Sequence, residues 1–401
     1  MNQTRDIFTP EQFRAQAVEL SQAMAELQRS QEIDPHDPFG NETEFHDYQP
    51  DYGEIVPQIR LPGCHIPLKP NSREKGRIRR FLNIVGGLLL AHLILSNVLA
   101  VGLEQLVLLL FRVVDTMAAG ELPEDYSSIA SQVFWASSSM IAMNLLAYGS
   151  LNVLTTWLGC RITKLRIPNL FRTHDFTPFL GFSYVCIILL LQFAMGYTAM
   201  GIDWVFEQVG VTLYEPDLTS DDSLRGIVIS AVYSIIVAPI TEELLMRGFV
   251  QKNLCRVSQH FGIITTAFLF GVWHENISQF LLAFAGGLFF GYIAAKHNSL
   301  IPSIICHMVV NTFAEVFTLC EDQGWLFAES IINVLYMALA LAGLLFLIRL
   351  LLVERFPSVT PHQAERGLRQ LLASPLLVGV IVCHIGIAVL AIVSATMEAA
   401  G

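Results

Sequence analysis

Long apolar runs alternate with short polar connections from about residue 81 to the end of the chain. Several runs extend for ~20 residues or more with few charges, enough to cross a hydrocarbon core at about 1.5 Å of rise per helical residue. The alternation of period two that a membrane β-barrel shows is absent, and in lipid each segment must pair its own backbone groups. We therefore expect about nine membrane helices, near residues 81–112, 129–159, 178–208, 225–250, 261–280, 281–296, 300–319, 329–349 and 373–396.

The region before the first apolar run is polar and predicts a soluble extension. Residues 1–70 contain no run long enough to cross a membrane. Thr9, Pro10 and Gln12 match an N-cap, a first-turn proline and the reciprocal half of a capping box, and apolar residues follow them at helical spacing. We expect a cytoplasmic amphipathic helix there, followed over residues 35–70 by a Pro-rich tether with little structure.

The predicted fold class is therefore all-α: a polytopic transmembrane helical bundle of about eight to nine helices with a soluble N-terminal extension. Residues 356–372 form a polar connection before the last apolar run, which we interpret as an addition outside the functional core. The chain then divides into residues 1–70, a transmembrane bundle at 75–355 and an additional C-terminal transmembrane helix at 373–396.

Composition is typical of a protein embedded in lipid. Of the 401 residues, 53% are apolar and only 15% are charged, which is unusual for a soluble globule. The formal net charge of −11 reflects acidic outer loops and an acidic N-terminal region, and it does not suggest nucleic-acid binding. The seven cysteines form no C-x-x-C pair, so neither a disulfide scaffold nor a zinc ribbon is predicted.

Basic residues predict the orientation, because Lys and Arg are retained on the cytoplasmic side of a membrane. They cluster before the first predicted helix and in alternate loops after it, whereas acidic residues dominate the loops between. With nine helices, the N-terminus is then cytoplasmic and the C-terminus lies on the opposite side. The basic residues before the first helix are Arg73, Lys75, Arg77, Arg79 and Arg80.

Ionisable side chains inside the predicted helices are few. Each costs at least ~2.5 kcal/mol on insertion scales, so each invites a functional hypothesis. We interpret His92, Glu104 and His384, which stand alone in the sequence, as packing or interface residues. Most of the others cluster in three consecutive blocks: Pro239-Ile-Thr-Glu242-Glu243-Leu-Leu-Met-Arg247, Phe270-Gly-Val-Trp-His274 and His307-Met-Val-Val-Asn311.

Spacing within these blocks indicates which side chains share a face. Glu243 and Arg247 are four residues apart, in the order that favours an ion pair along one helical face. Glu242 points about 100° away from Glu243 and is free to face elsewhere. His307 and Asn311 are also four residues apart, so both can point in one direction.

Depth in the membrane is compatible with a single shared site. Counting about 1.5 Å per residue from the nearest inner loop places Glu242 and His307 each at about 15 Å, and His274 at about 21 Å. The three side chains can therefore meet near the middle of the bilayer.

These residue types are suited to hydrolysis of a peptide bond. The reaction needs a water, a base that activates it and donors for the oxyanion that develops. Glu242 can act as the base, and His274 can hold the same water or return a proton to the leaving amine. His307 and Asn311 can donate hydrogen bonds to the carbonyl oxygen. Arg247 can orient the site or bind a substrate carboxylate.

The three motifs resemble those of the CAAX-processing and bacteriocin-processing (CPBP, or Abi) intramembrane proteases, which include the type II CAAX prenyl endopeptidases. The pattern E-E-x-x-x-R, then F-x-x-x-H, then H-x-x-x-N occurs here in order within about residues 225–315. The resemblance implies a core of about eight membrane helices. It implies catalytic roles for Glu242, His274, His307 and Asn311, with orienting or structural roles for Glu243, Arg247 and Phe270.

The resemblance also implies a substrate: a peptide bond of a membrane-associated protein or peptide, including prenylated CAAX-type proteins. It does not establish a CAAX substrate, because the family also includes bacteriocin-immunity and anchoring proteins. Members were long labelled metalloproteases, so the resemblance is compatible with a metalloendopeptidase class.

Zinc is an alternative to metal-free activation of water, since Glu242, His274 and His307 are of the types that bind zinc. We favour the metal-free reaction, which requires no cofactor. If Glu242 were a ligand and Glu243 were tied to Arg247, no obvious general base would remain.

Two other functions stay open at this stage. One is a catalytically inactive membrane scaffold of the same fold, although a scaffold has no need to bear the cost of buried charges. The other is a proton-coupled transporter, since intramembrane Glu, His and Arg also serve proton relays. No inverted repeat or pair of broken helices is visible in the sequence, so we favour the intramembrane endopeptidase.

Overall fold

The computed structural model describes residues 72–119, 126, 129–130, 138–173, 176–213, 223–255, 257–354 and 361–400. The helix and tether expected within residues 1–70 lie outside the described residues. No strand occurs in the described part of the chain. The helices are α2 (Ser72–Ala119), α4 (Ser138–Thr163), η1 (Ile167–Phe171), α5 (Pro178–Gln208), α6 (Leu224–Val232), η2 (Tyr233–Val237), α7 (Ala238–Glu243), η3 (Leu244–Gln251), α8 (Lys252–Leu254), α9 (Gln259–Val272), α10 (Ile277–Lys296), α11 (Ile301–Asp322), α12 (Leu326–Val353), α13 (Pro361–Leu372) and α14 (Pro375–Ala400).

The predicted all-α membrane bundle is confirmed. Two of the nine predicted helices are not among the segments that qualify as full spans. Helix α4 is long enough, with 26 residues, but is not apolar enough, and α9 is too short, with 14 residues. Seven described helical segments are long and apolar enough to cross a membrane: Ile78–Ala118, Pro178–Gln208, Leu224–Leu254, Ile277–Lys296, Ile301–Asp322, Leu326–Val353 and Pro375–Ala399. The chain is thus an integral, multi-pass membrane protein.

One predicted helix boundary is wrong. The sequence pattern placed a break between helices at 261–280 and 281–296, whereas α9 ends at Val272 and α10 begins at Ile277. At 14 residues, α9 rises about 21 Å, less than the ~30 Å of a hydrocarbon core. The turn after α9 therefore lies within the depth of the bundle.

Local hydrogen bonding explains this turn. The Asn276 side chain accepts a hydrogen bond from the Gln279 amide at 2.7 Å, which makes Asn276 the N-cap of α10. Glu275 takes a left-handed conformation with φ of +58°, which ends α9. Mean hydropathy does not detect such a cap, because the average over a long window is dominated by the apolar helices on both sides.

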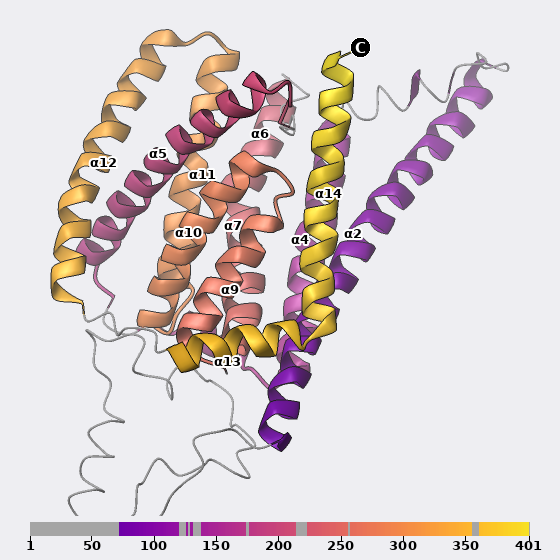
Figure 1. Ribbon diagram of the computed structural model, residues 1–401. Coiled ribbons are helices and arrows are strands. Elements are labelled where there is room, and N and C mark those ends of the chain that lie inside the picture. Colours follow the sequence, from indigo (N-terminus) through magenta and orange to yellow (C-terminus); the bar gives the residue numbers. More distant parts are fainter. Residues whose placement is uncertain are drawn as a thin grey trace, which may run out of the picture.

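Figure 1 shows the helices in two groups with the central ones between them. The first group contains α5, α10, α11 and α12, in which α10 and α12 both pack on α5. The second contains α2, α4 and α14, in which α4 and α14 both pack on α2. The segment from α6 to α9 lies between the two groups, and α13 crosses the lower end. The start of α2 and the end of α14 lie at opposite ends of the bundle.

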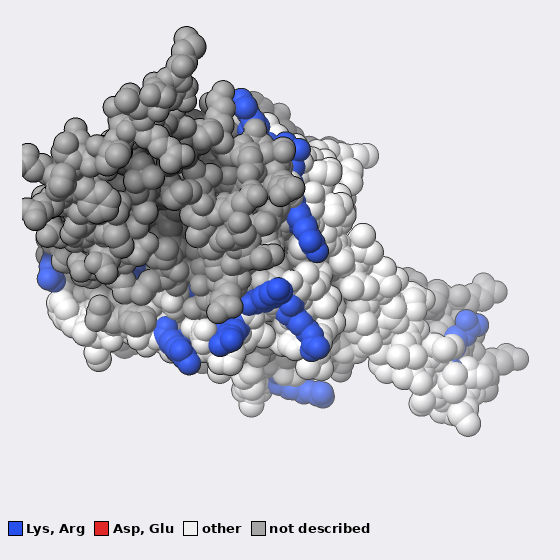
Figure 2. Space-filling view, turned by 90° about the horizontal axis from the view of Figure 1, so that it is seen from below, with Lys and Arg blue, Asp and Glu red and all other residues white. Residues whose placement is uncertain are grey.

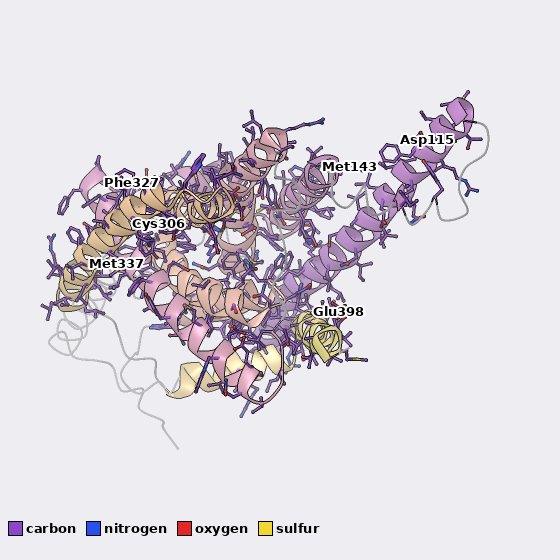
Figure 3. All side chains as sticks on the ribbon, turned by 90° about the horizontal axis from the view of Figure 1, so that it is seen from above. Asp115, Met143, Cys306, Phe327, Met337 and Glu398 are labelled. Atoms are coloured by element: carbon purple, nitrogen blue, oxygen red, sulfur yellow. The ribbon has the colours of Figure 1, made fainter. Side chains whose placement is uncertain are left out.

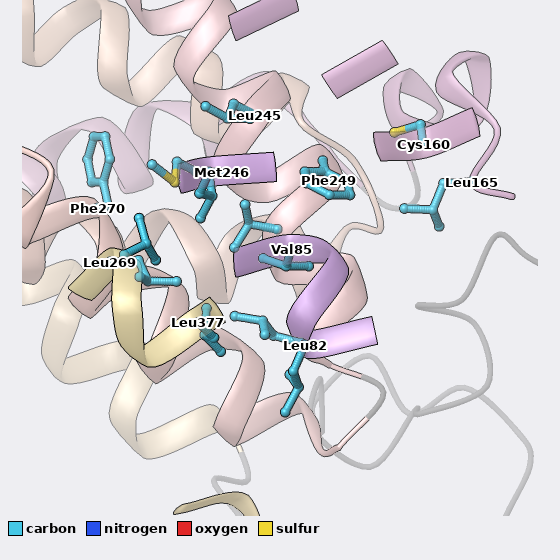
Figure 4. Close-up of a cluster of buried hydrophobic side chains, with 14 of the residues drawn as sticks. Leu82, Val85, Cys160, Leu165, Leu245, Met246, Phe249, Leu269, Phe270 and Leu377 are labelled. Atoms are coloured by element: carbon cyan, nitrogen blue, oxygen red, sulfur yellow. The ribbon is translucent and has the colours of Figure 1, made fainter. Parts of the chain in front are cut away.

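Two apolar clusters hold these groups together. One cluster joins α5, α10 and α11 around the fully buried Tyr184 and the buried Phe290. The other cluster packs η3 and α9 against the lower parts of α2 and α14, and Figure 4 shows its side chains meeting from these elements. Its members include Leu82, Val85, Met246, Phe249, Leu269 and Leu377.

The outward surfaces are apolar, as lipid contact requires. Large hydrophobic side chains are exposed along α12 and along the C-terminal half of α2. Seen from above, Asp115 near the end of α2 lies far to one side of Cys306, which sits on α11 inside the bundle (Figure 3). On the face seen from below, the charged side chains visible in the described part are Lys and Arg (Figure 2). The positive-inside rule assigns this face to the cytoplasm, so the N-in, C-out orientation stays our prediction.

Candidate active site

A buried ion pair forms one side of the site. Arg247 Nη1 donates to Glu243 Oε1 at 2.7 Å, and both side chains are fully buried, so the pairing that their spacing predicts is present. The Arg247 guanidinium also lies over the Phe270 ring at 4.5 Å and the Phe290 ring at 5.3 Å. Its second terminal nitrogen donates to the Gly287 carbonyl at 3.4 Å. The first motif, Glu242–Arg247 (motif one), is thereby packed against α10 and against the second motif, Phe270–His274 (motif two). The third motif, His307–Asn311, is motif three.

His307 from α11 lies between the two glutamates of motif one. Its Nδ1–H donates to Glu243 Oε1 at 3.2 Å, and its Nε2 lies 3.8 Å from Glu242 Oε2. The second separation exceeds a normal hydrogen bond but is short enough for electrostatic attraction. Motifs one and three therefore meet, as the depth argument predicts.

Asn311 contacts the backbone of η2. Its Nδ2 donates to the Ser234 carbonyl at 2.7 Å. The helix is widened here, because the Ala238 amide donates to the Tyr233 carbonyl five residues back. In that register the Ser234 carbonyl would accept from residue 239, but Pro239 has no N–H. Asn311 supplies the hydrogen bond that the proline cannot make, and its amide keeps a second N–H.

The same serine contacts a residue that the sequence interpretation left without a role. Ser234 Oγ donates to Glu315 Oε2 at 2.7 Å. Glu315 follows Asn311 and His307 at intervals of four residues, so the three polar side chains lie along one face of α11. This spacing is the signal that could have added Glu315 to the site.

His274 lies in the turn after α9 and not within a helix, which corrects the sequence interpretation. Its Nδ1–H donates to the Phe270 carbonyl at 2.8 Å, so in this tautomer Nε2 keeps a free lone pair. The Phe270 ring touches both imidazoles, with centroids 5.0 Å from His274 and 5.8 Å from His307. Motif two thus reaches motif three through Phe270, while a shared water between His274 and Glu242 stays a prediction.

The residue before Glu242 is tied to two helices at the other side of the site. Asn152 of α4 donates to Thr241 Oγ1 at 3.2 Å, and the Asn152 side-chain oxygen accepts from His92 Nε2 of α2 at 2.9 Å. His92 therefore has the partner expected of a packing residue. Its chain of hydrogen bonds nevertheless ends beside the predicted base, a link across sequence that periodicity does not reveal.

Two glycines one turn apart let η3 lie close to α10. Gly287 offers its carbonyl to Arg247, and Gly291 accepts from Gln251 Nε2 at 2.9 Å. A Cβ added at Gly291 would lie 2.7 Å from Gln251 Oε1, so a larger residue would disturb this contact. Small residues spaced by four are a common device for close helix packing in membranes, and the sequence interpretation overlooked this pair.

No group of three or more His, Cys, Asp or Glu side chains in the described part of the chain is arranged to hold a metal ion. Glu242, His274 and His307, the ligands of the zinc alternative, therefore do not form a three-donor set in this geometry. The metal-free reaction stays our prediction.

Comparison with known proteins places this core. Residues 224–313 match the family described as Type II CAAX prenyl endopeptidase Rce1-like. The matched segment runs from α6 into α11 and contains all three motifs.

A curated relative supports the same placement. A protein of Bacillus subtilis (strain 168) named "Putative membrane peptidase YdiL" is 27% identical over 111 residues. The alignment covers 27% of this chain and 45% of that relative, so it spans less than half of the relative's length. No solved structure matches the chain.

Proposed function

We propose that the chain is an intramembrane endopeptidase that cleaves a membrane-associated protein with a water activated by Glu242 and His274, without a bound metal. One observation carries the proposal: Glu242 and His307, from separate membrane helices, face each other at 3.8 Å beside the buried Glu243–Arg247 pair. The match to the Rce1-like family and to a relative named as a membrane peptidase supports the same class of reaction.

Glu242 acts as the general base in this proposal. Its carboxylate takes a proton from a water, whose oxygen attacks the carbonyl carbon of the scissile bond. His274 orients that water, because its Nδ1–H is used by the Phe270 carbonyl and its Nε2 can accept a hydrogen bond. When the C–N bond breaks, the proton passes from Glu242 to the leaving nitrogen, which regenerates the carboxylate.

The attacked carbonyl oxygen becomes negatively charged and requires donors. Asn311 gives one N–H to Ser234, which fixes the plane of its amide, and directs the other to the substrate. With both ring nitrogens protonated, His307 donates from Nε2 to this oxygen while its Nδ1–H remains on Glu243. The Glu243–Arg247 pair thus holds the imidazole in position rather than reacting.

Prenylated CAAX peptides are the substrate class to test first, because the matched family is described as prenyl endopeptidases. The full-length protein in lipid nanodiscs would be given a farnesylated CAAX peptide with a fluorophore and a quencher on either side of the bond after the prenylated cysteine. The same peptide without the farnesyl group reports the lipid requirement. We expect cleavage by the wild type and at least about a hundredfold slower cleavage by Glu242→Gln, which lacks the base.

Glu242→Gln nearly preserves the shape of the side chain, so its thermal unfolding in nanodiscs should match that of the wild type. Cleavage by Glu242→Gln at the wild-type rate would overturn the mechanism. If neither protein cleaves the peptide, membrane proteomes of cells carrying each form should differ in C-terminal fragments, and identical fragment sets would overturn the function. One zinc per active protein would contradict the metal-free reaction.

A further inference from the structure

The last helix reaches the turn that carries His274. His384 Nδ1 of α14 donates to Glu275 Oε1 at 2.8 Å, and the two side chains are 3% and 30% exposed. Helix α14 lies outside residues 224–313, the segment that matches the family. Contact at this point was not expected, since the sequence interpretation set His384 aside and treated the last helix as an addition.

Glu275 is the residue in the turn that is best placed to move His274. It follows His274 directly and has a left-handed φ of +58°, a conformation that costs energy for a residue other than glycine. The turn backbone is held by two 3.2 Å hydrogen bonds, from His274 to Gly271 and from Glu275 to Val272. A displacement of Glu275 therefore also displaces the backbone of His274, one peptide away.

The residue on the other side of His274 is held as well. The Trp273 ring contacts two imidazoles, with ring centroids 4.8 Å from His92 of α2 and 5.1 Å from His384 of α14. Both histidines are almost fully buried, at 1% and 2% exposure. Residues 273 and 275, on either side of His274 in the sequence, are thus both in contact with helices outside the matched core.

The two helices that make these contacts, α2 and α14, pack closely against each other at their lower ends. A Cβ added at Gly86 of α2 would lie 2.3 Å from the Leu377 amide, so the backbones of α2 and α14 are in close contact. The Leu376 amide also donates to the Asn83 side chain at 3.2 Å. Leu377 and Val380 are fully buried and stand with His384 at helical spacing of three and four, so one buried stripe fixes the rotation of α14.

We propose that His384 is a positioning residue: through its hydrogen bond to Glu275 and its contact with Trp273, α14 holds the His274 imidazole in the orientation that water activation requires. This role rests on the endopeptidase function proposed above. The catalytic unit of this chain then extends beyond residues 224–313 to its last membrane helix. Misplacement of a catalytic group by about 1 Å is enough to slow a reaction strongly.

The test uses the full-length protein in nanodiscs and the farnesylated peptide described above. His384→Phe keeps an aromatic ring beside Trp273 and removes the donor to Glu275. We expect kcat to fall about tenfold while KM stays within about twofold, because substrate binding does not involve this pair. His384→Gln, whose amide can still donate to Glu275, should recover kcat to within about threefold of the wild type. Cys383→Ser, at the neighbouring exposed position of α14, is the matched control and should be unchanged.

A double-mutant cycle separates coupling from general damage. Glu275→Met, which removes the acceptor, should lower kcat about as much as His384→Phe, and the two together should lower it no further than either alone. Losses that multiply to about a hundredfold would mean that the residues act independently and would overturn the proposal. Equal kcat in the wild type and His384→Phe would also overturn it.

A second measurement does not depend on peptidase activity. Diethyl pyrocarbonate modifies the free nitrogen of a neutral imidazole, and mass spectrometry can follow the reaction at His274. In His384→Phe we expect this rate to rise at least about threefold, because the turn is released, whereas Cys383→Ser should match the wild type. An unchanged or lower rate would overturn the positioning role. If no form cleaves the peptide and the membrane proteomes of wild type and Glu242→Gln have identical fragment sets, but the His274 rate rises, the endopeptidase proposal fails while the structural coupling stands.

Discussion

The glutamate side and the histidine side of the candidate site are fixed in different ways. On the glutamate side, Glu243 accepts hydrogen bonds of 3.2 Å or less from both Arg247 and His307, and all three belong to the family-matched segment. On the histidine side, His274 sits in a turn whose neighbours, Trp273 and Glu275, are held by helices outside that segment.

This difference teaches where each half of a shared site obtains its rigidity. A buried ion pair keeps its two side chains together without support from other helices, because leaving one charge unpaired in a low-dielectric interior is very unfavourable. A turn has few internal hydrogen bonds and depends on its neighbours. We therefore expect substitutions of Glu243 and Arg247 to change stability first, and those of His274 and its neighbours to change the reaction first.

The largest expected effect concerns the reaction. His274→Gln should lower kcat by about 10²–10⁴, the usual contribution of a positioned acid–base group. The free energy of unfolding in detergent should be unchanged, because the polar contact described for the His274 side chain is a local one, to the Phe270 carbonyl four residues earlier. Cleavage assays and thermal unfolding on the same preparation measure both. Normal turnover would place water activation on the glutamate side alone.

On the glutamate side, Arg247→Met should destabilise the protein by about 3–5 kcal/mol, since it leaves the Glu243 carboxylate buried without its cation. Equilibrium unfolding in mixed detergent micelles measures the loss. The double variant Glu243→Gln with Arg247→Met should recover a large part of it, because no unpaired charge remains. A double variant as unstable as Arg247→Met would show that the guanidinium acts mainly through the Phe270 and Phe290 rings.

Asn311 tests the boundary between the two kinds of effect. Asn311→Ala should raise the barrier of cleavage by about 2–4 kcal/mol, the usual loss on removing an oxyanion donor. Part of any loss could arise from the Ser234 carbonyl, which would lose its partner. Pro239→Ala restores an N–H in the register of that carbonyl, so it separates the two causes. If Pro239→Ala with Asn311→Ala regains full activity, the oxyanion role is wrong.

The smallest expected effect concerns packing against α10. Gly291→Ala should destabilise the protein by about 1–3 kcal/mol, because the new methyl group meets the Gln251 side chain at 2.7 Å. Gly379→Ala on α14 is the matched control, since an added Cβ there meets nothing within 4 Å. That control should be neutral or slightly stabilising, as alanine favours a helix over glycine. Equal unfolding free energies for both variants would contradict the packing argument.

Several features could be predicted from the sequence because they depend on short spacings. Glu243 and Arg247 pair as their separation of four predicts, and His307 reaches Glu243 as the depth count allows. The long apolar runs became membrane helices, since a backbone in lipid can satisfy its hydrogen bonds only within its own segment. The end of α9 was missed because Asn276 acts through one local side-chain bond, which a hydropathy average does not register.

The sequence by itself determined the helical class and the three blocks of polar residues, because each follows from composition or from helical periodicity within one segment. Only the tertiary structure decided that Asn311 replaces the amide missing at Pro239, and that His384 reaches Glu275 from 109 positions away. Such contacts depend on how separate helices cross. No periodicity within a single helix carries that information.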